Sequence, residues 1–176
     1  FLMIAYSAGK SYRKNRQDPE NDRCFAETEE RAMEREVFIR VRGEQRCGGE
    51  RPEVTELFCE GVLEREEDGW TLTYDEDGGA AGERVRARLR FDGRRAELTR
   101  EGTVSSSMTF APGERHTAFY ELPVGSLTME ILTDALREGG GTDELLELCY
   151  RIVVNGGEVS GNRLAFRLLP RAEREE

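Results

Sequence analysis

A repeated alternation of apolar and polar residues most limits what this chain can fold into. The clearest instance runs from Arg84 to Phe91, where four arginines alternate with valine, alanine, leucine and phenylalanine. Successive side chains of a β-strand point to opposite faces, so this segment has one face for a core and one for water. Similar period-two patterns recur near residues 37–41, 57–63, 70–75, 96–102, 108–110, 115–121, 127–133, 146–154 and 164–168.

Turn-forming dipeptides separate these segments, among them Asp68-Gly69, Asp92-Gly93 and Asn155-Gly156. Such residues accept the positive φ that tight hairpins require. Strands that are apolar on one face gain a shared interior and lose their exposed edges when the sheet closes. The sequence therefore predicts an all-β fold, an antiparallel up-and-down β-barrel of about eight to ten strands. A two-sheet sandwich is the alternative, and residues 132–138 are open to a helical turn instead of a strand.

The composition changes near Met33. Both lysines, Lys10 and Lys14, precede it, and every Lys or Arg position from there onward is arginine. Residues 1–32 are close to neutral and lack a period-two pattern, so the rest of the chain carries the net charge of −10. We expect residues 1–32 to be a dispensable N-terminal extension, either disordered or upstream of a true start at Met33. Residues 33–170 are expected to form the barrel and 171–176 a charged tail.

Charge and composition exclude several classes of function. A net charge of −10 repels phosphate backbones and anionic lipid surfaces, so we expect neither nucleic-acid nor membrane binding. The cysteines at 24, 47, 59 and 149 form no CxxC pair, and His116 is the only histidine. We therefore expect no metal or other cofactor, and reduced thiols in the cytoplasm. Without a Gly-x-Ser-x-Gly elbow or a second imidazole, the chain is not expected to be an enzyme.

Several short pieces between residues 36 and 169 occur in a characteristic order. They are Tyr74-Asp75-Glu76, Arg100-Glu101-Gly102-Thr103-Val104, Met108-Thr109-Phe110, the run from Tyr120 to Leu127, Thr133, and the run from Leu148 to Ile152. In this order and spacing the chain resembles the YwiB-like family of uncharacterised bacterial proteins. The resemblance implies a barrel similar to calycins, the class that includes lipocalins, and it implies no activity. The chain departs from the family at Leu122-Pro123-Val124-Gly125, where Thr-Pro-Tyr-Gly is usual, so no role for a tyrosine carries over.

Strand parity places several polar side chains on inward faces. For the strand near 115–121 parity leaves two faces open, one with His116 and Tyr120 and the other with Thr117 and Phe119. We expect Glu76 and Arg100 to meet inside the barrel as a hydrogen-bonded ion pair, since a buried arginine needs a partner. In the interpretation that we favour, the inward polar groups satisfy one another and the barrel is filled. In the alternative they line a cavity for a small molecule. This candidate cluster or ligand-binding site consists of Glu76, Arg100, His116, Tyr120, Thr133 and Tyr150.

Two functions follow as hypotheses. The first is a binder of a small molecule inside the barrel, which a continuous internal cavity above about 300 Å³ would favour. The second is a structural or protein-interaction module, which a filled interior beside an exposed apolar patch would favour. Phe58 and Val62, both expected to face outward, are candidates to seed such a patch or a homodimer contact.

Overall fold

The structure is a computed structural model that describes residues 33–77, 83–141 and 143–170. The predicted extension at 1–32 and the predicted tail at 171–176 lie outside the described residues. Within the described ranges, no helix has the length and apolarity to cross a membrane.

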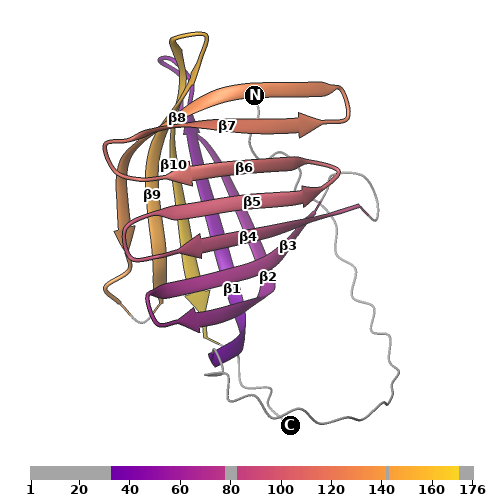
Figure 1. Ribbon diagram of the computed structural model, residues 1–176, viewed down its shortest axis with the longest axis vertical. Coiled ribbons are helices and arrows are strands. Elements are labelled where there is room, and N and C mark those ends of the chain that lie inside the picture. Colours follow the sequence, from indigo (N-terminus) through magenta and orange to yellow (C-terminus); the bar gives the residue numbers. More distant parts are fainter. Residues whose placement is uncertain (1–32, 78–82, 142, 171–176) are drawn as a thin grey trace.

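Ten antiparallel strands form one closed sheet (Figure 1). Each strand pairs with its neighbours in the sequence, and β1 also pairs with β10. The predicted barrel is thus confirmed, and the alternative of an open two-sheet sandwich is wrong. The strands are β1 (Met33–Arg46), β2 (Glu53–Glu66), β3 (Gly69–Asp77), β4 (Arg84–Phe91), β5 (Ala96–Gly102), β6 (Ser105–Phe110), β7 (Arg115–Leu122), β8 (Gly125–Glu138), β9 (Glu144–Val154) and β10 (Gly157–Leu169).

The barrel has two walls. In Figure 1, strands β4 to β7 run side by side across the front, while β1, β9 and β10 cross behind them at a steep angle. Strands β4 to β7 have six to eight residues each, whereas β1, β2 and β8 have 14. The long strands span the height of the barrel, and the short ones close its front.

Residues 132–138 belong to strand β8, so the alternative of a helical turn there is wrong. Past an irregularity between Thr133 and Ala135, pairing with β9 continues as far as Glu138, which lies opposite Leu146. Because a bulge absorbs one residue without ending the ladder, the strand bends and keeps its hydrogen bonds. The local sequence does not show that these residues are a strand, because their backbone hydrogen-bond partners lie on β9, which is distant in the sequence.

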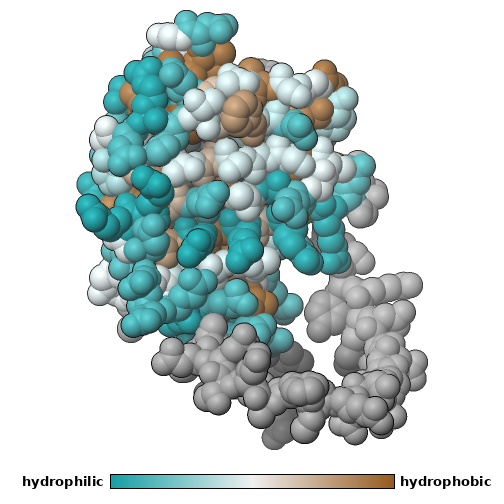
Figure 2. Space-filling model, viewed as in Figure 1, coloured by the Kyte–Doolittle hydropathy of each residue, from teal (hydrophilic) through white to brown (hydrophobic). Residues whose placement is uncertain are grey.

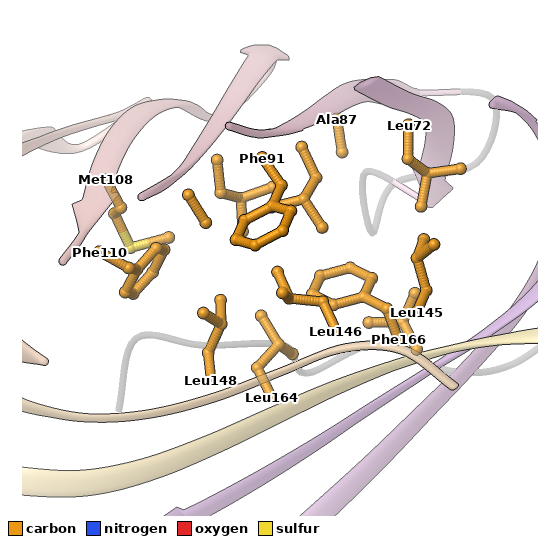
Figure 3. Close-up of a cluster of buried hydrophobic side chains, with 14 of the residues drawn as sticks. Leu72, Ala87, Phe91, Met108, Phe110, Leu145, Leu146, Leu148, Leu164 and Phe166 are labelled. Carbon is orange, nitrogen blue, oxygen red and sulfur yellow. The ribbon is translucent and has the colours of Figure 1, made fainter. Parts of the chain in front are cut away.

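All ten strands contribute buried apolar side chains to one core. Figure 3 shows part of it, with Leu72, Phe91 and Met108 from one wall facing Leu148 and Phe166 from the other. The alternation seen in the sequence produces this core directly, because β4 is buried at every second residue and exposed at the others.

Aromatic rings from opposite walls meet across the interior. The rings of Tyr74 on β3 and Phe166 on β10 lie 6.3 Å apart, and those of Phe110 on β6 and Tyr150 on β9 lie 4.9 Å apart. Neither pair of strands is adjacent in the sheet. Edge contacts at such distances leave no wide space between the walls at these two points.

Candidate functional site

The most unusual feature of the interior is a buried ion pair. Arg100 on β5 donates from Nε to Oε2 of Glu76 at 2.9 Å and from Nη2 to Oε1 at 3.2 Å. The Arg100 side chain is 4% exposed and that of Glu76 is 18% exposed. Tyr74 on β3 donates its hydroxyl to Oε1 of the same carboxylate at 3.1 Å. The sequence-based expectation that Glu76 and Arg100 pair inside the barrel is therefore confirmed.

The sheet register explains why these groups meet. Ala87 on β4 lies opposite Tyr74 on one side and Arg100 on the other. Its small side chain lets the long guanidinium of Arg100 reach over β4 to the carboxylate on β3. On the other side of β5, Arg100 lies opposite Ser106, and Ser106 lies opposite Tyr120 on β7. A row of polar side chains therefore crosses the inner face of the front wall.

The surroundings raise the pKa values of Arg100, Tyr74 and Tyr150. Burial acts to lower the pKa of Arg100, but the negative charge of Glu76 and interactions with Tyr120 and Tyr74 outweigh it, so the pKa is raised. Burial and the charge of Glu76 raise the pKa of Tyr74, against an opposing effect of Arg100. Burial also raises the pKa of Tyr150, again opposed by Arg100. Arg100 therefore stays charged, and the hydroxyls of Tyr74 and Tyr150 keep their protons.

Three buried polar atoms near the β5–β6 hairpin have no hydrogen-bond partner among the described residues. They are Nη1 of Arg100, Oγ1 of Thr103 and Oγ of Ser106. All three can donate a hydrogen bond, and leaving a buried donor unsatisfied costs about 1–3 kcal/mol. This end of the barrel is thus suited to an acceptor such as a carbonyl or hydroxyl oxygen. Because Glu76 already neutralises Arg100, a neutral acceptor fits the local charge.

The predicted cluster of six residues does not form as one group. Tyr120 and Tyr150 are buried and interact electrostatically with Arg100. Thr133 lies opposite Tyr150, but its hydroxyl accepts a hydrogen bond from the backbone NH of Ala111 at 3.2 Å. Thr133 therefore anchors the turn between β6 and β7.

His116 lies outside that cluster, so its predicted place in it is wrong. It shares the inward parity of Ala118, but it lies at the start of β7 and is only half-buried. Its Nε2 lies 3.0 Å from Oε2 of the exposed Glu114. Strand parity does not separate a central position from one at the rim, where the side chain bends back to water.

Sequence reasoning missed a second interior polar group, formed by Gln45, Ser160 and Asn162. The amides of Asn162 and Gln45 donate to Oγ of Ser160 at 3.0 and 3.3 Å. Beside Asn162 and Tyr150 the interior opens into a space of about 20 Å³, enough for a single water-sized group. The alternation along β10 could have predicted this group, because Ser160 and Asn162 share a face with the buried Leu164.

An apolar patch lies on the outer surface of β10, β1 and β2. Phe38 is 40% exposed, and across the strand pairs it lies opposite Leu169 on β10 and diagonal to Phe58 and Val62 on β2. Phe58 is 53% exposed, and the guanidinium of Arg40 lies 5.7 Å from its ring centroid. We call Phe38, Phe58, Val62 and Leu169 the β1 patch. Phe58 and Val62 both lie on the outer face of β2, as expected. Phe58 is exposed there, whereas Val62 is partly buried.

Much of the remaining surface is charged. The face shown in Figure 2 is mostly hydrophilic, with apolar residues in separate brown areas. A hollow of about 400 Å³ lies over the outer side of β8, β9, β10 and β1. Its arginines are engaged in ion pairs, such as Arg163 with Glu147 and Arg167 with Glu144. The hollow is therefore a charged surface groove that borders the β1 patch, because Phe38 and Arg40 are neighbours on one face of β1.

Fold and interior together define a closed ten-stranded antiparallel barrel that carries a buried ion pair. A family described as a domain of unknown function, DUF1934, matches residues 39–166, and the chain belongs to this family. The fold is similar to the crystal structure of the YwiB protein from Bacillus subtilis, with a TM-score of 0.61 and 15% sequence identity. That match covers 78% of this chain and 94% of YwiB. The resemblance to YwiB-like proteins is thus confirmed, and at this identity the match shows the fold alone. No curated protein matches the sequence significantly.

Proposed function

We propose that this barrel is a non-enzymatic protein-interaction module that acts through the β1 patch. The observation that carries the proposal is that aromatic rings meet across the interior, while two phenylalanines are exposed on the adjacent outer strands β1 and β2. Two phenylalanines that are 40% and 53% exposed on adjacent strands are costly to leave in water. Burying them against another protein removes that cost.

The interior supports the same proposal. A pocket for a drug-sized molecule needs several hundred cubic ångströms, whereas the opening beside Tyr150 has about 20 Å³. Rings from opposite walls touch in the middle of the barrel. A large apolar ligand of the kind that wide calycin barrels hold would have to displace these contacts. The cytoplasm remains the compartment that we propose, and the free thiols of Cys47, Cys59 and Cys149 are typical of it.

A second candidate function is the binding of a small polar molecule at the β5–β6 end. The unpartnered donors of Arg100, Thr103 and Ser106 favour it. Such a ligand would place one acceptor oxygen beside Nη1 of Arg100 and keep the rest of its body toward the rim, where Glu76 is partly exposed. The resemblance to calycins agrees with this candidate but does not identify a ligand.

Native mass spectrometry of the protein isolated from the cell that makes it would separate the two candidates. We expect a retained protein chain and no retained small molecule. Phe38→Glu should remove the protein chain, whereas Phe119→Glu should retain it, because Phe119 is 62% exposed but lies on β7 away from the patch. A small-molecule mass that Ser106→Ala removes would instead establish the second candidate. A bare monomer would overturn the proposed function.

A further inference from the structure

We propose that the partner of the β1 patch is a second copy of this chain, bound face to face and antiparallel through strand β1. This inference rests on the proposed function and names the partner of the same surface. It comes from the order of charges along the outer face of β1.

From Glu34 to Arg42 the outer face of β1 is antisymmetric in charge about Phe38, and beyond Arg42 the same face continues with Glu44 and Arg46. The side chains of Val37, Ile39 and Val41 point into the core and are at most 9% exposed. The residues between and beside them therefore point outward. In chain order they are two acids, one aromatic residue and two bases: Glu34, Glu36, Phe38, Arg40 and Arg42.

A two-fold axis through Phe38 makes this face complementary to itself. Closed dimers use the same surface on both subunits, so each residue must suit the residue that the axis brings to it. If β1 of the second copy lies antiparallel over β1, Phe38 meets Phe38 of the second copy. Glu36 then faces Arg40 of the second copy, and Glu34 faces Arg42. A parallel arrangement would instead place acid on acid and base on base.

Strand β2 agrees with the same axis. Phe58 lies opposite Arg40, and Val62 lies opposite Glu36, so the two residues are at equal distances on either side of Phe38. The axis therefore brings Phe58 onto Val62 of the second copy. The apolar centre then includes Leu169, which is level with Phe38 on β10. Because the outer surface of a barrel curves away on both sides of a strand, contact is concentrated on β1.

The surface groove described above receives the acidic end. Its lining includes Arg40 and Arg42, and it continues from Phe38 along β1 and β10. Both arginines already contact carboxylates of their own chain, namely Glu56 and Glu44. A guanidinium has five N–H donors, so each can bind a second carboxylate without losing the first. The groove is lined by both arginines and glutamates, and at its β1 edge it presents Arg40 and Arg42 to the acidic segment of the second copy.

Like charges on β2 oppose association, and they include Glu56 and Glu64, which lie opposite Arg42 and Glu34 and which the axis brings level with each other. Glu60 lies opposite Phe38 on β2, so the axis brings it level with Glu60 of the second copy. Like charges directly opposite one another are destabilising. We therefore expect a weak dimer, with a dissociation constant in the range of roughly 1–100 µM.

The first test is sedimentation velocity of the full chain over a concentration series spanning that range. We expect a concentration-dependent shift from monomer to dimer. Phe38→Glu should raise the dissociation constant about tenfold or more, while Phe119→Glu should leave it unchanged. A wild-type chain that stays monomeric throughout overturns the inference. So does a dimer that Phe38→Glu leaves intact.

A charge-reversal experiment tests the geometry itself. The double variants Glu34→Arg/Glu36→Arg and Arg40→Glu/Arg42→Glu each carry one sign from residue 34 to residue 42, so each alone should be monomeric. Mixing them should restore a dimer of one copy of each, detectable by native mass spectrometry. The variant with all four reversals should dimerise with itself. If either double variant dimerises alone, or if the mixture does not associate, the antiparallel arrangement is wrong.

Glu60→Gln gives an independent check, because this substitution should strengthen the dimer and not weaken it. Removing the like-charge approach should tighten the dimer about two- to five-fold. An unchanged or weakened dimer would place Glu60 away from the axis and contradict the arrangement. Failure of the inference differs from failure of the proposed function. If the purified chain is monomeric but the chain isolated from its own cell carries a different protein that Phe38→Glu removes, the inference of a dimer fails and the proposed function stands.

Discussion

Two arginine–glutamate pairs lie on opposite sides of the same sheet. Inside the barrel, Arg100 pairs with Glu76 and is 4% exposed. Outside, Arg163 donates from Nε to Oε2 of Glu147 at 3.0 Å, and Arg163 is about half exposed. The groups and distances are nearly the same. The surroundings of the arginines differ, since Arg100 lies among core side chains and Arg163 at the surface, whereas both carboxylates are partly buried.

The difference shows that burial, not geometry, decides what an ion pair is worth. Exposed pairs typically contribute about 0.2–1 kcal/mol, because water solvates either partner when the other is removed. Breaking a buried pair costs about 3–5 kcal/mol, because the remaining charge has no solvent. Two residues of one barrel that form the same contact should therefore respond very differently to the same substitution.

The largest effect is expected from breaking the inner pair. Arg100→Leu or Glu76→Leu should lower the free energy of unfolding by about 3–5 kcal/mol in urea denaturation. Glu76→Leu should be the worse of the two, since Arg100 cannot lose its proton, whereas Glu76 is partly exposed. The matched control is Arg86→Leu on the outer face of β4, which should change stability by less than about 0.5 kcal/mol.

Replacing both partners sharpens the same comparison. The double variant Glu76→Met/Arg100→Met should be clearly more stable than either single Leu variant, because no lone charge stays buried. A loss below about 1 kcal/mol for Arg100→Leu alone would mean that water reaches the inner pair. The inner and outer pairs would then be equivalent, and the polar row would no longer be a candidate ligand site.

An intermediate effect is expected at Thr133, a neutral polar group inside the barrel. Thr133→Val keeps the shape but removes the acceptor for the buried backbone NH of Ala111. An unsatisfied buried donor costs about 1–3 kcal/mol, which thermal or urea denaturation would detect. Thr117→Val on the exposed face of β7 is the control and should be nearly neutral. Equal effects at the two threonines would argue against the anchoring role of Thr133.

The smallest effect is expected at the outer pair, and it should depend on pH. Hydrogen bonds from Arg163 hold the pKa of Glu147 below its usual value of 4.5, against an opposing effect of burial, and Arg137 assists. A carboxylate whose pKa is lower in the folded state than in the unfolded state stabilises the fold at pH values above its unfolded pKa. This stabilisation is lost as the pH falls through its pKa in the folded state. Glu147→Gln should therefore cost at most about 1 kcal/mol at pH 7.

The pH profile distinguishes this effect from a change in packing. The difference in unfolding free energy between wild type and Glu147→Gln should shrink as the pH falls below about 4.5 and vanish in stronger acid. Chemical denaturation at several pH values measures it directly. A difference that is constant from pH 7 to strong acid would mean that the side-chain amide disturbs packing and that the ion pair contributes nothing.

The amino-acid sequence by itself determined the strands and their faces. A period of two is a local property, because each residue of a strand points opposite to the one before it. It was enough to place Arg100 and Glu76 inward and Phe58 outward. It also carries the charge order from Glu34 to Arg42, which needs only the knowledge that this segment is a strand.

Only the tertiary structure decided which of those side chains meet and how much space they leave. Ser106 lies opposite Arg100 because of the β5–β6 hairpin register, and the hydroxyl of Thr133 is occupied by Ala111 because the β6–β7 turn packs there. Whether the interior is open or filled depends on rings such as Phe110 and Tyr150 reaching across from strands that are not adjacent. Register, bulges and closure join residues far apart in the chain, so a local periodicity carries no information about them.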